Sequence, residues 1–291
     1  MSITPRKRYE VPLPGGRVLV LGERPLVMGI VNITPDSFAE SLPRMDSAAA
    51  IDLALQMEAD GADLVDIGGE STRPGAQAVS AEEELARILP VLRGLAGRLR
   101  IPMSVDTYKA ATAHAAIDAG ALVINDISGL GYDPALARVV SEGGAALVLM
   151  HTRGRPATMD AEAVYDDVMA EVVAELRAGL ARAAGAGVAA AAVIVDPGIG
   201  FAKRPPHSYG VLARLPELAA ALDRPLLVGP SRKSFLREAV GDRPAAERDW
   251  GTAAAVTAAV LGGAHIVRVH AVLEMAQVVR VAEEIRRYAK S

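Results

Sequence analysis

The chain has 291 residues, 51% of them hydrophobic, so it can bury a large core and is not intrinsically disordered. A formal net charge of −4 excludes a broad cationic surface for nucleic acid or anionic membrane, but it leaves room for a local anion site. The absence of cysteine excludes disulfides, thiolate metal sites, iron–sulfur clusters and cysteine nucleophiles.

The amino-terminal sequence MSITPRKRYE lacks the apolar stretch of a secretory signal peptide. No run of about 18 uncharged apolar residues predicts a membrane span, since the apolar stretch 188–195 is short and ends at Asp196. We therefore expect a cytoplasmic protein.

A hairpin is expected at residues 9–22, where two alternating runs flank the turn sequence Pro14-Gly15-Gly16. From residue 26 onward one pattern recurs eight times: a short apolar run ends in polar residues, and an alanine-rich segment follows. The runs are Leu26–Val31 before Asn32, Leu64–Val65 before Asp66, Ile101–Val105 before Asp106, Leu122–Ile124 before Asn125, Ala145–Met150 before His151, Ala191–Val195 before Asp196, Leu226–Val228 before Gly229, and His265–Val269 before His270.

Helices are expected between these runs. Residues 46–60 begin with a capping aspartate and end before Gly61, and Ser80–Glu83 matches a capping box. Residues 160–187 read as a long alanine-rich helix, and residues 272–289 form the last one.

Eight buried strands alternating with helices fit an α/β fold of the closed (β/α)8 TIM-barrel type, with a doubly wound open sheet as the alternative. The eightfold count and the polar strand ends favour the barrel. No linker divides the chain, so we expect a single domain over residues 1–291, with the hairpin at 9–22 and the barrel at 26–290.

In such a barrel the carboxyl ends of the strands face one rim, and their side chains converge on one pocket. The polar residues at these ends mix carboxylates, amides and cations, a combination that can hold a polar heterocycle together with an anion. They are Asn32, Asp66, Glu70, Thr72, Arg73, Asp106, Asn125, Asp126, His151, Asp196, Lys233, Arg268 and His270.

Asp106 and Asp196 each follow a buried strand. A carboxylate there can accept two parallel hydrogen bonds from the amidine-like edge of a pterin or guanine, or it can orient a neighbour or cap a helix. For Asp66 a structural role is favoured, because Gly68-Gly69 follow at once and the chain must turn there. Asp126 is a candidate cap of its own loop.

The segment Gly229–Ser234 (GPSRKS) opens a helix after the seventh run, where barrels often bind phosphates or carboxylates. Ser231 alternatively serves only as an N-cap, and Lys233 as a solvated lysine. Alternation places Arg268 and His270 on one side of the last strand, which suits a diphosphate, although His270 also fits a core histidine.

Asn32 is the candidate metal ligand, for a hard ion such as Mg²⁺ held with water and substrate phosphates. The loops 34–38 and 70–75 are rich in turn residues, and we expect them to close over a ligand. Phe38 is a candidate docking contact for an apolar ring or a loop anchor.

Seven segments together resemble the dihydropteroate synthase family of the folate pathway. ESTRPGA and SRKSF are the most specific, and the segments run from the first strand to the last. They are MGIVNITPDSF (28–38), DIGGESTRPGA (66–76), SVDTYKA (104–110), INDISG (124–129), DPGIGFAK (196–203), GPSRKSF (229–235) and RVH (268–270).

The resemblance implies that 6-hydroxymethyl-7,8-dihydropterin diphosphate is joined to 4-aminobenzoate, with Mg²⁺, giving 7,8-dihydropteroate and diphosphate. It assigns the pterin to Asp106, Asn125, Asp196 and Lys233, with Phe201 and Met150 as walls, and the diphosphate and Mg²⁺ to Asn32, Arg268 and His270. The aminobenzoate side falls to Thr72, Arg73, Pro74, Phe38 and Ser234, and the catalytic candidates are Asp106, Lys233, Arg268 and Glu40.

The chain departs from the family pattern at four places. The first loop usually reads SFSDGG, whereas Ala39-Glu40-Ser41-Leu42 follow Ser37-Phe38 here, and Glu40 takes the place of the usual Asp. Ala271 replaces the usual Asp after RVH, Ala202 the second glycine of GFGK, and Thr152 a common Met. None of these changes removes a predicted pterin or diphosphate group.

Two other functions share the predicted pocket. A pterin-dependent methyltransferase would pass a methyl group to a corrinoid and has no use for Arg268, His270, Thr72 and Arg73 at an anion site. A non-catalytic pterin-binding paralogue would fit the altered first loop. The resemblance also implies a homodimer formed through the last helices.

Overall fold

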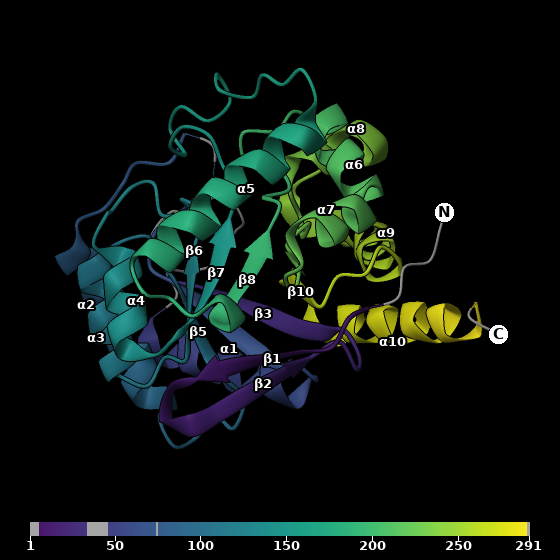
Figure 1. Ribbon diagram of the computed structural model, residues 1–291. Coiled ribbons are helices and arrows are strands. Elements are labelled where there is room, and N and C mark those ends of the chain that lie inside the picture. The colour runs from purple at the N-terminus through teal and green to yellow at the C-terminus, as the bar shows by residue number, and fades with distance from the viewer. Residues whose placement is uncertain (1–5, 34–45, 74, 290–291) are drawn as a thin grey trace.

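The computed structural model describes residues 6–33, 46–73 and 75–289. In these ranges an antiparallel hairpin precedes parallel strands that alternate with helices, as the sequence predicts (Figure 1). The hairpin pairs β1 (Tyr9–Leu13) with β2 (Arg17–Leu21). Its turn needs glycine, because Gly15 and Gly16 have φ angles of +73° and +72°.

The parallel strands close into a barrel. The sheet order is β8-β7-β6-β5-β4-β3-β10-β9, and a parallel bridge between Val195 and Leu226 joins the two ends of that order. This bridge excludes the open doubly wound sheet. The strands are β3 (Leu26–Asn32), β4 (Leu64–Gly68), β5 (Met103–Asp106), β6 (Val123–Asp126), β7 (Ala146–Met150), β8 (Val193–Asp196), β9 (Leu227–Val228) and β10 (Ile266–Val269).

Helices surround the barrel (Figure 1). Most strands are followed by one helix, whereas two follow β8 and two follow β9. The helices are α1 (Ser47–Ala59), α2 (Ala81–Leu95), α3 (Ala110–Asp118), α4 (Leu136–Gly143), α5 (Val168–Gly185), α6 (Pro205–Ala213), α7 (Leu215–Leu222), α8 (Arg237–Val240), α9 (Asp249–Leu261) and α10 (Val272–Tyr288).

Capping side chains set several helix starts. Asp46 accepts a hydrogen bond from the Ala49 amide (2.7 Å) at the start of α1, and Ser80 accepts one from Glu83 (3.2 Å) at the start of α2. The predicted start of the long helix at residue 160 is wrong. Asp167 caps α5 through the Met169 and Ala170 amides, so the helix begins at Val168.

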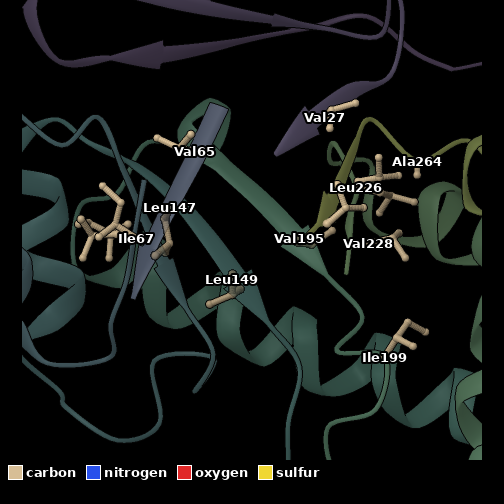
Figure 2. Packing of buried hydrophobic residues seen from close by; sticks show 14 of the residues in the cluster. Val27, Val65, Ile67, Leu147, Leu149, Val195, Ile199, Leu226, Val228 and Ala264 are labelled. Atoms are coloured by element: carbon tan, nitrogen blue, oxygen red, sulfur yellow. The ribbon is translucent and has the colours of Figure 1, made fainter. Parts of the chain in front are cut away.

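The larger part of the core lies between the barrel and its helices. Figure 2 shows part of this layer, including Val65 and Ile67 from β4 and Leu147 and Leu149 from β7. The packing is close: a Cβ added at Gly29 would lie 2.6 Å from the sulfur of Met57. These contacts hold the strands, and therefore their polar ends, in fixed positions.

A second cluster fills the amino-terminal end of the barrel. Val11 and Leu21 of the hairpin are fully buried there, against strand residues such as Met28 and Ile266. In Figure 1 the hairpin lies at the end of the barrel away from the arrowheads of β7 and β8. The hairpin thus closes one end, and the mouth at the carboxyl ends is left for a ligand.

Within the ranges given above, none of the helices combines the length and the apolar character needed to cross a membrane.

Candidate functional site at the barrel mouth

One layer of residues runs across four neighbouring strands at the mouth. Asn32 pairs in register with Gly68, Gly68 with Asp106, and Asp106 with Asn125. A Cβ added at Gly68 would lie 3.5 Å from the Cβ of Asp106 and 3.6 Å from Oδ1 of Asn32. The register therefore brings three predicted site residues side by side, as expected from strand ends that share one rim.

Arg268 connects this layer from the last strand. Its Nε donates to Asp66 Oδ2 at 2.6 Å, and its Nη2 donates to Asp106 Oδ2 at 2.9 Å. Asn125 Nδ2 also donates to Asp66 Oδ2, at 2.9 Å. Asp66 is fully buried inside the barrel, where it holds two predicted site residues, Asn125 and Arg268. Its role is structural, as expected, but it acts through these contacts and not through the turn at Gly68-Gly69.

Burial and charge act on Asp106 in opposite directions. Desolvation is the larger influence and raises the pKa of this carboxyl to about 7, while the charge of Arg268 lowers it. The ion pair with Arg268, at 2.9 Å, therefore favours the carboxylate form against the effect of burial.

Asp196 lies at the end of β8, 6% exposed, and its Oδ1 accepts a hydrogen bond from the Gly198 amide at 2.7 Å. Burial raises the pKa of Asp196, and the charges of Lys233, Lys203 and Arg268 lower it. Gly198 has a φ of +66°, and a Cβ there would lie 1.9 Å from the carbonyl oxygen of His151. Glycine is therefore required for the turn that presents Asp196.

Lys233 approaches Asp196 from the loop after β9. Its ammonium donates to the carbonyl oxygen of Ile199 and lies 4.2 Å from the centroid of the Phe201 ring. Desolvation lowers the pKa of Lys233 to about 8, against the opposing charge of Asp196. Lys233 is thus a partly buried cation that lies between the Asp196 carboxylate and the Phe201 ring, and it is not a solvated surface lysine.

The expected anion-binding helix is shorter than its sequence suggests. Lys233 precedes a single 3-10 turn, Ser234–Leu236, which runs into the four residues of α8. Ser231 caps neither element; its hydroxyl lies 2.9 Å from His270 Nδ1 and accepts a hydrogen bond from the His270 amide at 3.2 Å.

Positive charge gathers around His270. Desolvation, and after it the charges of Arg232, Arg268, Arg73 and Lys233, lower the pKa of this imidazole to about 3. His270 is therefore neutral at neutral pH. Four cations that act on one side chain create a local field that favours an anion.

The remaining predicted residues occupy different depths. Phe201 and Met150 are buried in a small apolar cluster at the mouth with Tyr108 and Met159. Thr72 is half-buried, and Arg73 and Ser234 are exposed. Phe38, Glu40 and Pro74 lie outside the described residues.

The loop that carries Thr72 and Arg73 is anchored on both sides. Glu70 accepts hydrogen bonds from the Tyr108 hydroxyl (2.7 Å) and the Val79 amide (3.1 Å), and Lys109 forms an ion pair with it. The Gly75 amide donates to the Pro156 carbonyl of the loop after β7, at 2.9 Å. A contact within the loop and contacts with two neighbouring loops thus fix the position of this segment.

Two strand-end residues serve the protein itself. Asp126 caps its own loop as predicted, because its carboxylate accepts hydrogen bonds from the Ser128 and Leu130 amides. His151 is buried and contacts Lys203, with its Nδ1 2.7 Å from the lysine Nζ. Sequence reasoning missed Lys203; the signal was a single cation within the segment Gly198–Lys203, whose other residues are uncharged.

The structure shows what two of the departures from the family pattern change locally. Ala202 has a φ of +44°, a conformation that favours glycine, which explains the usual residue there. Ala271 is the N-cap of α10 and makes no capping hydrogen bond, so an aspartate at this position would cap the helix.

Among the described residues, no group of three or more histidines, aspartates or glutamates could hold a metal ion. Asn32 presents one half-exposed amide oxygen at the mouth. This donor set fits Mg²⁺, which keeps several waters and binds through few protein oxygens plus substrate phosphates.

Comparisons with known proteins show similarity along almost the whole chain. The family model described as pterin binding enzyme matches residues 28–270. The chain is 45% identical over 280 residues to the dihydropteroate synthase of Synechocystis sp., covering 96% of each protein.

Solved structures match over nearly the whole chain. Yersinia pestis dihydropteroate synthase with a sulfonamide drug has a TM-score of 0.89 at 39% identity, covering 96% of this chain and 99% of that one. The Xanthomonas albilineans enzyme in complex with 7,8-dihydropteroate has a TM-score of 0.83 at 37% identity, covering 94% and 99%. The chain therefore belongs to the pterin binding enzyme family and, within it, to the dihydropteroate synthases.

Proposed function

We propose that the barrel mouth is where this chain condenses 6-hydroxymethyl-7,8-dihydropterin diphosphate with 4-aminobenzoate. The observation that carries the proposal is the pairing of two environments in one pocket. Buried carboxylates and an amide gather on one side, and cations gather around His270 on the other. A polar bicyclic ring fits the first environment, and a diphosphate fits the second.

The pterin side consists of Asp106, Asn125, Asp196 and Lys233. The carboxylates accept from the 2-amino and ring N–H groups, and the lysine donates to a ring oxygen or nitrogen. Phe201 packs against Lys233 and, with Met150, supplies an apolar wall for the ring. Asp66 orients Asn125 and Arg268 and does not itself contact the ligand.

The diphosphate side consists of Asn32, Arg268 and His270. Arg268 reaches the mouth with its charge held by Asp66 and Asp106, and His270 is fixed by Ser231. Asn32 would hold Mg²⁺, the proposed cofactor, through its amide oxygen. When bound, the ion supplies positive charge that makes diphosphate a better leaving group.

The residues at the mouth suit an early break of the bond between the pterin methylene carbon and the diphosphate oxygen. The dihydropterin ring stabilises the resulting cation, and Asp106 and Asp196 favour it electrostatically. The amino group of 4-aminobenzoate then attacks the methylene carbon, and its proton leaves to solvent or to the released diphosphate. No protein nucleophile is required.

For 4-aminobenzoate we propose Thr72, Arg73 and Ser234, together with Phe38 and Pro74. The fixed position of the loop after β4 supports this assignment, because Arg73 is near enough for its charge to act on His270. Glu40 remains a predicted catalytic residue of the first loop.

Three further proposals concern the whole chain. We propose that residues 1–291 act as one domain, and that the enzyme is cytoplasmic because a diphosphate substrate does not cross a bilayer and is used where it is made.

We also propose a homodimer through α10. Val281, Ile285 and Tyr288 form an exposed apolar stripe on that helix, which an Ile285→Glu substitution should disrupt, giving a monomer in light scattering.

The direct test mixes purified protein with both substrates and Mg²⁺ and follows diphosphate release. Wild-type protein should turn over, and Asp196→Ala or Lys233→Ala should nearly abolish turnover while the circular dichroism spectrum stays unchanged. A folded protein that releases no diphosphate, or that passes methyl from methyltetrahydrofolate to a corrinoid, would contradict the proposal.

A further inference from the structure

A buried lysine lies behind the pterin side of the mouth. Lys203 is 7% exposed and follows β8 by seven residues. Its Nζ lies 2.7 Å from His151 Nδ1 and donates to the carbonyl oxygen of Phe201 at 3.2 Å. Lys203 therefore holds, through the backbone, the residue that forms one wall of the pterin slot.

A chain of hydrogen bonds connects this lysine to the surface. His151 Nε2 lies 3.0 Å from Glu175 Oε2, and the Glu175 side chain is 39% exposed on α5. Desolvation lowers the pKa of His151 to about 4, so the ring is neutral near pH 7. Its Nδ1 accepts from the Lys203 ammonium, and its Nε2–H donates to Glu175.

Several charged groups face Lys203 from the elements packed around it. Asp196 and Glu175 favour its charged form, and Lys233 and Arg153 oppose it. The ring of Tyr165 lies 6.0 Å away. Desolvation is the largest influence and lowers the pKa of Lys203 to about 7, so its charge depends on these neighbours near neutral pH.

Asp196 is thus flanked by two lysines with different surroundings. Lys233 is partly exposed at the mouth, where the ligand would contact it, whereas Lys203 is buried behind the loop. Both charges lower the pKa of Asp196 against the effect of burial. Lys203 can therefore act on the ligand only through Asp196 and the loop.

We propose that Lys203 is a positioning residue for pterin binding. Its ammonium fixes the Phe201 wall and supplies the rear positive charge that keeps Asp196 ionised to accept the pterin edge, and Glu175, acting through His151, keeps that ammonium charged. The inference rests on the proposed pterin site, since it assigns the role through Asp196.

The test compares Lys203→Met with the matched control Arg204→Met, which removes the neighbouring exposed cation. KM for the pterin diphosphate should rise several-fold in Lys203→Met, because a smaller fraction of the free enzyme then has Asp196 ionised, with kcat unchanged. The acid limb of pterin-analogue binding, measured by calorimetry, should move to higher pH. Arg204→Met should match wild type, and Lys203→Arg should restore part of the loss.

Glu175→Gln provides a second arm that does not create a buried cavity. Without this carboxylate the pKa of Lys203 falls further, so binding at pH 7 should be weaker than in wild type and should recover as the pH is lowered toward 6. Lys203→Met should show no such recovery. If Lys203→Met fails to fold, this arm alone decides.

The outcomes separate the inference from the site on which it rests. Asp196→Ala should lose pterin binding in the same calorimetric assay. Normal binding by Asp196→Ala would overturn the proposed pterin site. Loss in Asp196→Ala with wild-type affinity and pH profile in both Lys203→Met and Glu175→Gln would overturn the role of Lys203 alone.

Discussion

Asp66 and Arg268 form a 2.6 Å ion pair between residues 202 positions apart in the sequence. The carboxylate is fully buried inside the barrel, and the guanidinium side chain is 17% exposed at the mouth. Because the same carboxylate oxygen holds Asn125, one residue from β4 orients side chains from β6 and β10. The mouth is thus organised from beneath by a fully buried residue.

Removing Asp66 should therefore weaken both the fold and the site. Asp66→Ala leaves Arg268 with one buried partner in place of two, and we expect a loss of about 3 kcal/mol in the free energy of unfolding measured with urea. Its kcat/KM should fall as well, since Asn125 and Arg268 lose their orientation. Asp118→Asn, an exposed carboxylate change, is the control. Wild-type stability and kcat/KM in Asp66→Ala would refute the role.

The sequence predicted the barrel, and it predicted that polar residues would share one end of it, because each strand is a short apolar run with a polar end. Strand register then places the polar ends side by side, as it does for Asn32, Asp106 and Asn125. The sequence could not distinguish residues proposed to contact the ligand from residues that hold those in position. Asp66 and Lys203 have ordinary local contexts, and only the closed barrel brings them to Arg268 and His151.

Two local errors in the predicted helices have identifiable causes. Residues 160–167 contain alanine and charged residues, as an exposed helical turn does, and the capping contacts of Asp167 mark the start of α5. The sequence GPSRKS indicated a longer helix, whereas Ser231 bonds to His270 from a strand 39 residues away. Such partners are not visible in a window of sequence.

Ala202→Gly should stabilise the protein. Alanine at a φ of +44° carries a steric cost of about 1 kcal/mol that glycine does not. The hydrogen bond from the Tyr165 hydroxyl to the Ala202 carbonyl, at 2.9 Å, holds this conformation in place. Urea unfolding should show a gain of that size, and a loss of stability would mean that the methyl group contributes packing that outweighs the strain.

Ala271→Asp should also stabilise the protein, by a different route. An aspartate at the N-cap of α10 can accept a hydrogen bond from an amide of the first turn, which is worth about 1 kcal/mol. Ala271→Asn should give most of the gain, because its side chain caps without charge. An unchanged midpoint of unfolding in both variants would show that the carboxylate in relatives has another role.

Acid should destabilise the fold through His265 at the base of the barrel. This buried ring accepts from the Leu226 amide (3.0 Å) and lies 2.9 Å from the Lys7 carbonyl, and desolvation lowers its pKa from 6.5 to about 4. Between those values the unfolded chain binds the extra proton, so the stabilisation is present above pH 6.5 and is lost as the pH falls toward 4.

Urea unfolding measured from pH 7.5 to 4.5 tests this expectation. His265 should contribute a slope of at most about 1.4 kcal/mol per pH unit, in the direction of lower stability at lower pH. His265→Gln preserves a donor and an acceptor without the titration, so its slope should be smaller. Equal slopes in the two proteins would exclude His265 as a source of acid instability.

A crystal structure with a bound pterin diphosphate analogue tests the central claim most directly. We predict that the ring edge contacts Asp106, Asn125 and Asp196, that Lys233 contacts the ring, and that the phosphates lie toward Arg268 and His270. A ring bound away from these residues, for example in the cavity of about 230 Å³ between β7 and α5 lined by Met150, Glu175 and Arg182, would contradict the account.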